Sequence, residues 1–574
     1  MKKHILVVIL TIFLTVVPFQ IRRASINIET EAPIYYEGHN ISDIFSGEST
    51  SVSNFENYLE DIAKTQVIIQ TNSVYLFEDD RPAFDGYSSE EIIRILKTHR
   101  MKASEYYKEE NSSLVKTLNL ENLTTNITYS KYTPFIFLEF SEELSTYQIS
   151  SISTLSTSSD VKAIYIQKIG TNSNQKSNEL EDAIAAANGT QVVNAGIYDG
   201  TGIIIGVLDG GIIDTDNDNF DDTTVTIKQE AGNTEATHPT AVASILGGEN
   251  GIAPGATLLS AQWDSFGDVD LVDLSDDIEW MIDNDVNVIN MSIWDVETDN
   301  LGEYSIGASY LDYIIRNTWV TIVGSAGNRG AGDDLITSPK IGYNVITVGS
   351  VDNSGELSDF SSWEENFGIS KPNLVAPGED FSIPNLGNVG SGTSYSSPMV
   401  AGTIALLMDK KSLLMLYPEA INAIISSSTA PLEYDDFDTS GLEETIGTGM
   451  LDIEAALAAT GTAHTTTNSS NHIGSYIFTK SVYLYAGQRI RIAAVQLVNS
   501  DQSTTPLVTN YDLFLVKSGL TVDSAQSTYN NIEFIDYVVP VTGYYYIKIK
   551  QISAKTTDHT DFFGMQYRVI TSSC

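Results

Sequence analysis

The sequence contains Gly392-Thr393-Ser394-Tyr395-Ser396-Ser397-Pro398, followed by an apolar run over 399–408. Proline is favoured in the first turn of a helix, where its missing N–H would have had no partner. We therefore expect Pro398 to open a helix over 399–408. Ser394 would lie beside the helix N-terminus, whose N–H groups and dipole favour negative charge. An alcohol nucleophile that attacks a carbonyl needs such donors nearby.

Two upstream stretches supply the base and the orienting acid that this nucleophile requires. Residues 203–211 form an apolar run that predicts a buried strand ending in Asp209. Residues 237–244 place His238 at the start of a predicted helix, and no other histidine occurs between His99 and His464. The order Asp, His, Ser is one of three chain orders in which this catalytic triad is found.

The three stretches resemble the signature blocks of the subtilisin-like serine peptidases (subtilases). Residues 320–328 resemble the family segment whose asparagine donates to the oxyanion, which assigns that role to Asn328. Short motifs at 251–254, 376–378 and 447–452 also resemble family motifs. The resemblance covers about 180–460 and implies Asp209, His238 and Ser394 as catalytic residues. Alternating apolar strands and helical segments in this region predict an α/β domain, with a parallel sheet and helices on both faces.

Residues 286–292 resemble the family strand that leads to the substrate-binding edge. An extended peptide would add to Ser292, Ile293 and Trp294 as a further strand. Trp294 stands where the family usually has a glycine, so its indole would narrow or reshape the adjacent pocket. Gly210 stands where Thr or Ser commonly follows the aspartate, which leaves the support of Asp209 open.

An oxygen-rich run at 214–222 contains Asp214, Asp216 and Asp218. Hard cations such as Ca²⁺ take several carboxylate and carbonyl oxygens, so these residues are candidate ligands of a structural calcium ion. The run lacks the spacing of an EF-hand, and a solvated acidic loop is the alternative. The chemistry itself requires no cofactor, and no His/Cys cluster suggests zinc.

The formal charge of -44 disfavours nucleic acid as a partner, because phosphate contacts need Lys and Arg. A hydrophobic content of 42% is ample for folded cores. Cys574 is the single cysteine, so no intrachain disulfide forms. The simpler interpretation of the negative charge is an acidic surface of an exported protein, and adaptation to high salt is the alternative.

The N-terminal region has a basic start followed by a short apolar run over 5–17. This pattern predicts a secretory signal over 1–24, with an uncleaved signal-anchor as the alternative. No later stretch is apolar enough to span a membrane. Residues 25–175 then contain an α+β domain, at about 57–168, with the element order β-α-β-β-α-β of a ferredoxin-like fold. It resembles the inhibitory propeptide of subtilases, with an unrelated α+β domain as the alternative, and self-cleavage is expected at 170–178.

The C-terminal part divides into a Thr/Ser/Asn-rich linker over 461–472 and a domain over 473–574. Short alternating runs predict a β-sandwich, which resembles the bacterial pre-peptidase C-terminal domain. The whole chain is thus expected to be a secreted serine endopeptidase made as a zymogen. We expect a monomer that acts on proteins or peptides, with its own propeptide as an intramolecular inhibitor. The alternatives are a non-catalytic binding protein on this scaffold and a maturation protease dedicated to one partner.

Overall fold

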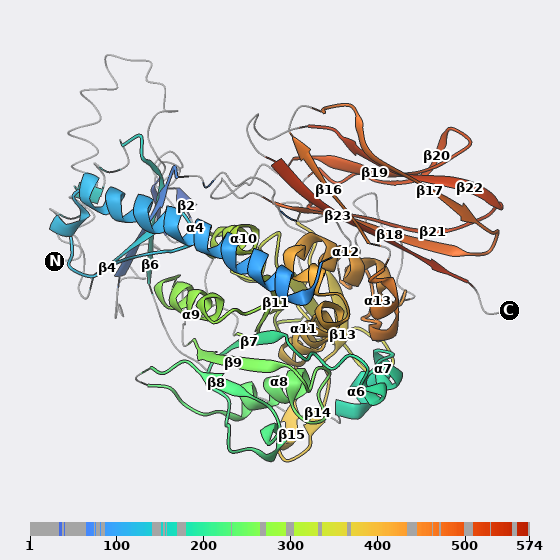
Figure 1. Ribbon diagram of the computed structural model, residues 1–574, viewed down its shortest axis with the longest axis horizontal. Helices are drawn as coiled ribbons and strands as arrows, with labels where there is room; N and C mark the ends of the chain where they lie inside the picture. The colour runs from blue at the N-terminus through green and yellow to red at the C-terminus, as the bar shows by residue number, and fades with distance from the viewer. Residues whose placement is uncertain are drawn as a thin grey trace, which may run out of the picture.

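The computed structural model has an N-terminal domain, a central domain and a C-terminal sandwich (Figure 1). The structure describes residues 34–36, 39–40, 65–73, 75, 81, 87–140, 148, 151–152, 155, 158–168, 180–230, 232–263, 271–293, 304–330, 336–363, 369–432, 445–461, 463–469, 472–498, 509–528, 530–553 and 560–571. The predicted signal over 1–24 and the predicted cleavage region at 170–178 lie outside these residues.

The central domain is built on a seven-stranded parallel sheet in the order β13-β12-β11-β10-β7-β9-β8. Apart from the edge strand β8, which is partly exposed, the strands are largely apolar and buried on both faces, as expected for a covered parallel sheet. Their bounds are β7 (Ile204–Asp209), β8 (Val225–Ile227), β9 (Thr257–Gln262), β10 (Val288–Met291), β11 (Thr321–Ser325), β12 (Ile346–Val351) and β13 (Leu374–Pro377).

Helices cover both faces of this sheet, which confirms the predicted architecture. Ile205 and Val207 of β7 pack in one apolar cluster with α8, α11 and α12. Leu208, which points to the opposite face, packs in another cluster with α9 and α10. The helix bounds are α6 (Leu180–Ala186), α7 (Thr190–Ala195), α8 (Thr237–Gly247), α9 (Leu271–Asp283), α10 (Ile306–Thr318), α11 (Thr393–Lys410), α12 (Pro418–Ser428) and α13 (Ile453–Ala459).

Helix α11 begins earlier than the sequence predicted. It starts at Thr393, with Gly392 as its N-cap, so that Pro398 lies inside the helix rather than at its start. Proline has no N–H to donate, so the carbonyl of Ser394, four residues earlier, lacks its intrahelical partner. The Ser292 hydroxyl donates to that carbonyl at 2.9 Å instead. A hydrogen bond from Ser292, just after β10, therefore replaces the intrahelical bond that Pro398 cannot form.

The N-terminal domain has the predicted α+β element order as far as the structure describes it. Its sheet runs β2-β1-β6-β3-β5-β4, and the long helix α4 lies against it. Most of the second predicted helix, 145–156, lies outside the described residues. The bounds are β1 (Ile34–Tyr36), β2 (His39–Asn40), β3 (Thr65–Thr71), α4 (Ser89–Thr117), β4 (Ile127–Tyr129), β5 (Phe135–Phe140) and β6 (Val161–Lys168).

The C-terminal domain consists of two four-stranded antiparallel sheets, consistent with the predicted β-sandwich. The predicted linker over 461–472 is wrong in its centre, because residues His464–Ser469 form β16 and pair with β23. Consecutive threonines favour an extended strand, and the buried Asn468 side chain donates to the Tyr511 hydroxyl at 2.8 Å. The remaining strands are β17 (Tyr476–Leu484), β18 (Arg489–Leu497), β19 (Tyr511–Lys517), β20 (Leu520–Ala525), β21 (Ile532–Val538), β22 (Gly543–Gln551) and β23 (Thr560–Ile570).

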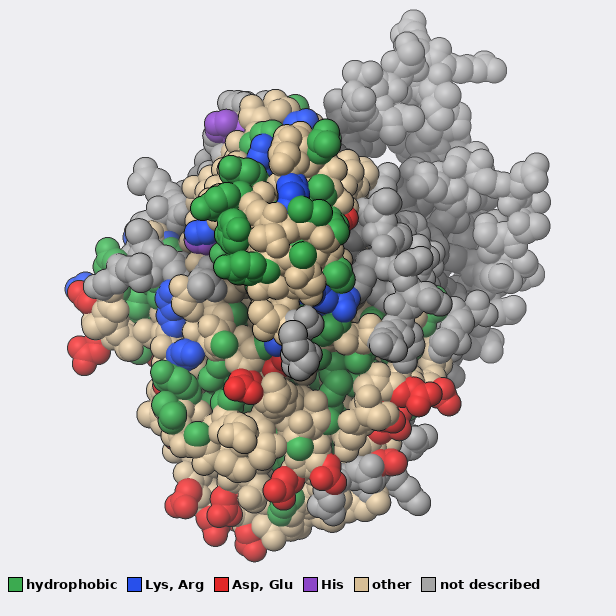
Figure 2. Space-filling view, turned by 90° about the vertical axis from the view of Figure 1, so that its right-hand side faces the viewer, with side chains coloured by type: hydrophobic (Ala, Val, Ile, Leu, Met, Phe, Trp, Pro, Cys, Tyr) green, Lys and Arg blue, Asp and Glu red, His purple; other side chains and the backbone are tan. Residues whose placement is uncertain are grey.

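Charged side chains are unevenly spread over the face that Figure 2 shows. On the face in Figure 2, Asp and Glu gather over the lower part, and Lys and Arg lie with hydrophobic side chains higher up.

Tyr483 and Tyr544, which lie opposite each other on β17 and β22, are 47% and 62% exposed. Within the described ranges, every helix is too short or too polar to cross a bilayer.

Candidate functional site

An aspartate–histidine pair lies at the carboxyl edge of the sheet. Asp209 is the last residue of β7 and is buried, and His238 is in the first turn of α8. The Nδ1 atom of His238 lies 2.8 Å from Oδ1 and 3.0 Å from Oδ2 of Asp209. The Gly210 backbone N–H also donates to Oδ1, at 2.7 Å. The Asp209 carboxylate thus accepts a hydrogen bond from the backbone of residue 210, although glycine has no side-chain hydroxyl to donate.

The protonation of His238 depends on this pairing. Burial lowers the pKa of the imidazole, but the charge of Asp209 and the hydrogen bond to it raise the pKa more. The net result is a pKa above the ordinary value of 6.5. A raised pKa favours proton uptake by Nε2, because Nδ1 is held by the carboxylate. The side chain keeps 26% of its surface exposed, so the ring is accessible from outside.

Ser394 is the second residue of α11, between the buried residues Thr393 and Tyr395, and is itself partly exposed. The Tyr395 ring centroid lies 5.6 Å from that of His238, which brings the start of α11 to the aspartate–histidine pair. The structure therefore pairs Asp209 of β7 with His238 of α8 and places the residue after Ser394 beside the imidazole. Contact between the Ser394 hydroxyl and His238 stays a prediction.

Polar side chains hold the start of α11 in place, a role that the sequence did not predict for them. Ser292, just after β10, donates to the Ser394 carbonyl and lies 3.1 Å from the Ser397 hydroxyl. Asn290 Nδ2 donates to the Ser292 hydroxyl at 2.8 Å. Asn290 is fully buried in an otherwise apolar strand, and such a polar residue needs a partner. In the sequence, the polar residues Asn290 and Ser292 alternate within an apolar run, and this pattern could have predicted a buried hydrogen bond between them.

Asn328 follows β11 at the same edge of the sheet and faces the start of α11. Its Oδ1 atom accepts from Thr393 N at 2.8 Å and from Thr393 Oγ1 at 3.0 Å. These two donors fix which end of the amide is the oxygen. The Nδ2 atom lies on the Gly392 side, where an added Cβ would approach it to 3.1 Å. The amide donor is thereby held next to the backbone that precedes Ser394.

The predicted substrate edge is described only in part. Ser292 donates its backbone N–H to Leu208 O at 3.2 Å, within the sheet, and its hydroxyl supports α11. Ile293 is buried, and its carbonyl accepts from Lys340 Nζ at 3.3 Å. Trp294 lies outside the described residues. Pairing of substrate along this segment stays a prediction.

The three aspartates proposed as calcium ligands do not form a cluster. Asp214 accepts from the N–H of Asp216 at 3.1 Å, and Asp218 begins a short 3-10 helix over 218–220. No group of three or more His, Cys, Asp or Glu side chains suited to a metal occurs in the part of the chain that the structure describes. These contacts are those of a turn stabilised by its own side chains, and calcium binding stays a prediction.

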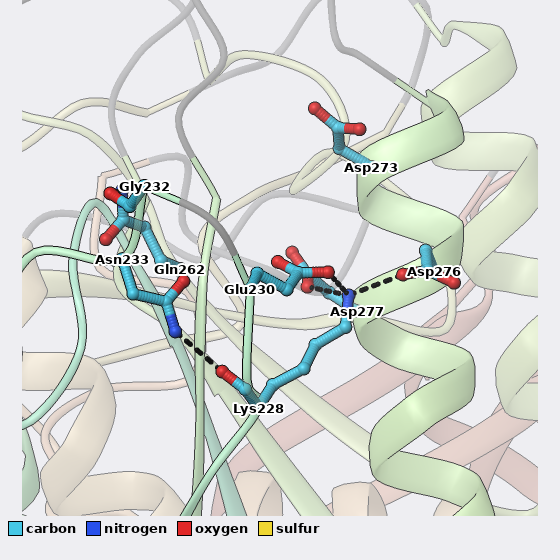
Figure 3. A pocket seen from close by; sticks show the side chains of 8 residues that line it. All are labelled: Lys228, Glu230, Gly232, Asn233, Gln262, Asp273, Asp276 and Asp277. Carbon is cyan, nitrogen blue, oxygen red and sulfur yellow. Dashed lines mark hydrogen bonds and ion pairs between the residues drawn. The ribbon is translucent and has the colours of Figure 1, made fainter.

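An acidic cavity of about 450 Å³ lies between α9 and the segment 228–233, which precedes α8. Figure 3 shows the Lys228 ammonium among three carboxylates, Glu230 at 2.6 Å, Asp276 at 2.6 Å and Asp277 at 2.7 Å. Burial raises the pKa of Asp277 to about 7, although Lys228 lowers it. The wall residue Gln262 is the neighbour of Asp209 in the sheet. The cluster ties the segment that leads to His238 to α9.

Replacing Lys228 by methionine is expected to destabilise the fold by about 3–5 kcal/mol at pH 8, because it leaves the Asp277 carboxylate buried without its cation. The deficit should shrink toward pH 5, where Asp277 takes up a proton in the folded state. Urea unfolding at both pH values measures it. Lys97→Met, which breaks an exposed pair with Asp285, is the control and should cost less than about 1 kcal/mol. A deficit independent of pH would contradict this assignment.

A parallel α/β domain with an aspartate–histidine pair beside a serine at a helix N-terminus is the arrangement of serine hydrolases. Comparison with known families agrees with this class: residues 200–471 match the model of the Subtilase family. This range of the chain is thus similar to the Subtilase family.

Curated relatives match less than half of the chain. The thermostable alkaline protease of Halalkalibacterium halodurans is 29% identical over 238 residues, which cover 40% of this chain and 62% of that protein. The minor extracellular protease Epr of Bacillus subtilis is 26% identical, covering 45% and 38%. Subtilisin DY of Bacillus licheniformis is 28% identical, covering 46% and 94%. This chain therefore spans less than two thirds of the first two relatives.

Among solved structures, the prenylagaramide maturation protease PagA is 28% identical, covers 47% of this chain and 96% of its own, and has a TM-score of 0.39. The patellamide maturation protease PatA is 27% identical, with coverages of 46% and 97% and a TM-score of 0.38.

Proposed function

We propose that the chain is a serine endopeptidase that hydrolyses peptide bonds through an acyl-enzyme. The observation that carries the proposal is the bond of His238 Nδ1 to both carboxylate oxygens of Asp209, beside the helix start that bears Ser394. Similarity to the Subtilase family over 200–471 and to proteases from two bacteria supports the same conclusion.

In this mechanism Ser394 Oγ attacks the substrate carbonyl, and His238 Nε2 takes the hydroxyl proton and gives it to the leaving amine. Asp209 holds Nδ1–H and stabilises the imidazolium without taking the proton. The Asn328 amide and the Ser394 backbone N–H donate to the oxyanion. Water then enters, His238 accepts its proton, and the acyl-enzyme is hydrolysed to release the acid and restore Ser394.

We further propose that the protein is exported as a zymogen and that its N-terminal domain acts as an intramolecular inhibitor. The basic and apolar start of the chain supports export, as does the extracellular relative Epr. The N-terminal domain supports the inhibitor role, because it packs directly on α9 and α10 of the subtilase domain. A structural calcium ion at 214–222 remains part of the proposal on its oxygen-rich composition alone.

Labelling with a fluorophosphonate probe tests the proposal, since the probe forms a covalent bond with an activated serine. After cleavage at 170–178 the protein is expected to be labelled, whereas Ser394→Ala and His238→Ala, cut there by an added protease, should not be. Ser391→Ala is the matched control and should be labelled as well as the parent. Absence of labelling in the folded parent, before and after cleavage at 170–178, would favour a non-catalytic binding protein.

A further inference from the structure

The N-terminal domain and the rest of the chain share one apolar core. The sheet face formed by Ile68, Phe135 and Tyr165 packs in a single buried cluster with α9 and α10. The Phe135 ring lies 6.1 Å from Tyr310 and 5.8 Å from Tyr313, centroid to centroid. Dissociation of the domain would expose this apolar surface to water, which is unfavourable in proportion to its area.

Helix α4 extends the contact between the N-terminal and central domains, because it runs past α10 toward α12 (Figure 1). Arg100 is buried and donates to Thr318 O at 2.9 Å and to Val286 O at 2.8 Å. Its charge stands at the C-terminus of α10, where a cation stabilises the helix dipole. If the N-terminal domain dissociated, the Thr318 and Val286 carbonyls would lose their hydrogen bonds to Arg100.

His99, the residue before Arg100, stacks on the Trp319 ring with centroids 3.4 Å apart and planes at 10°. Burial lowers the pKa of His99 to about 3. The ring is therefore neutral from pH 5 upward, and mild acid does not place a charge in this contact.

Arg81 joins the N-terminal domain to both other domains. Its Nη1 atom donates to Leu416 O and to Glu419 Oε1, each at 2.9 Å, and the Arg81 and Glu419 side chains are 1% and 0% exposed. The guanidinium carbon lies 4.2 Å from the centre of the Phe562 ring, on β23 of the sandwich. A charge pair this buried is costly to break, because one charge stays behind without its partner.

We propose that the N-terminal domain stays bound after the chain is cut between residues 169 and 179, as a permanent non-covalent subunit. Three contacts hold the domain: the apolar core that it shares with α9 and α10, the Arg100 side chain at the C-terminus of α10, and the buried Arg81–Glu419 ion pair. The Phe562 ring of the C-terminal sandwich lies against the Arg81 guanidinium. Cutting would then separate the two polypeptides without releasing the domain. The proposal does not depend on peptidase activity, because any protease can make the cut.

The test uses full-length Ser394→Ala with residues 171–177 replaced by the recognition sequence of a site-specific viral protease. After cutting, both fragments are expected to elute together in size-exclusion chromatography, at the volume of the uncut protein, at pH 5 and pH 8 and in 1 M NaCl. Elution of the N-terminal fragment by itself under native conditions would overturn the proposal. Melting curves of the uncut protein establish that it is folded.

Variants in the same background locate the attachment. Arg81→Ala is expected to raise the dissociation constant of the cut fragments about 10²–10³-fold, by loss of a buried pair. Lys97→Ala, on the same domain but in a pair whose side chains are 53% and 42% exposed, is the matched control and should change it less than about fivefold. Arg100→Met serves as a second buried variant with the same expectation as Arg81→Ala. Equal effects of Lys97→Ala and both buried variants would contradict the assignment of these contacts.

Discussion

Replacing Ser394 by alanine is expected to lower kcat for peptide hydrolysis about 10⁶-fold and to leave the chain uncut at 170–178. The magnitude is taken from subtilisin, to which this domain is similar, where nucleophile and base act as a unit. Without the hydroxyl no acyl-enzyme forms, and only the oxyanion donors and substrate binding remain to assist attack by water. Peptide turnover and the mass of the purified chain measure both effects.

Ser391→Ala is the control for this prediction, because Ser391 lies three residues earlier and its hydroxyl serves a different contact, accepting from Asp380 N at 2.8 Å. It should be processed and should turn over like the parent. Normal processing of Ser394→Ala would show that another protease cuts the chain. Residual activity within about tenfold of the parent would remove Ser394 from the role of nucleophile.

Much of the central domain could be predicted because its signals are local. Apolar runs ending in Asp209 and in Asn328 mark buried parallel strands and place both residues at one edge of the sheet. His238 is in the first turn of a helix, as its proline predicted. The same rule misplaced the start of α11, because the Ser292 hydroxyl, over a hundred residues earlier, compensates for Pro398.

Long-range contacts account for what the sequence did not predict. The composition of 461–472 favoured a linker, whereas pairing with β23 makes its centre a strand. Arg81 and Arg100 look like ordinary surface cations in the sequence, since their carbonyl partners lie hundreds of positions away. Likewise, nothing local marks Thr393 as the residue that orients the Asn328 amide. Such roles depend on tertiary structure rather than on composition or periodicity.

Replacing Asp209 by asparagine is expected to lower kcat about 10⁴-fold and to shift the pH profile at the same time. The neutral amide offers no charge to stabilise an imidazolium, and its NH₂ group can face Nδ1 and favour the wrong tautomer. In the parent, the pKa of His238 lies above 6.5 because Asp209 outweighs burial, so kcat/KM should fall with acid from above that pH. In the variant only burial acts strongly on the pKa, which therefore moves down, and activity should persist to lower pH.

This combination separates a positioning carboxylate from one that merely supports the fold. Loss of stability would lower activity at every pH without moving the acidic limb, whereas loss of the Asp209 charge moves the limb toward acid. Asp182→Asn, at an exposed position in the first turn of α6, is the matched control and should change neither kcat nor the limb. An Asp209→Asn profile that falls at the same pH as the parent would mean that another group sets the limb. His238 would then not be the base whose protonation state controls the reaction, because its two bonds to Asp209 are the interactions that raise its pKa.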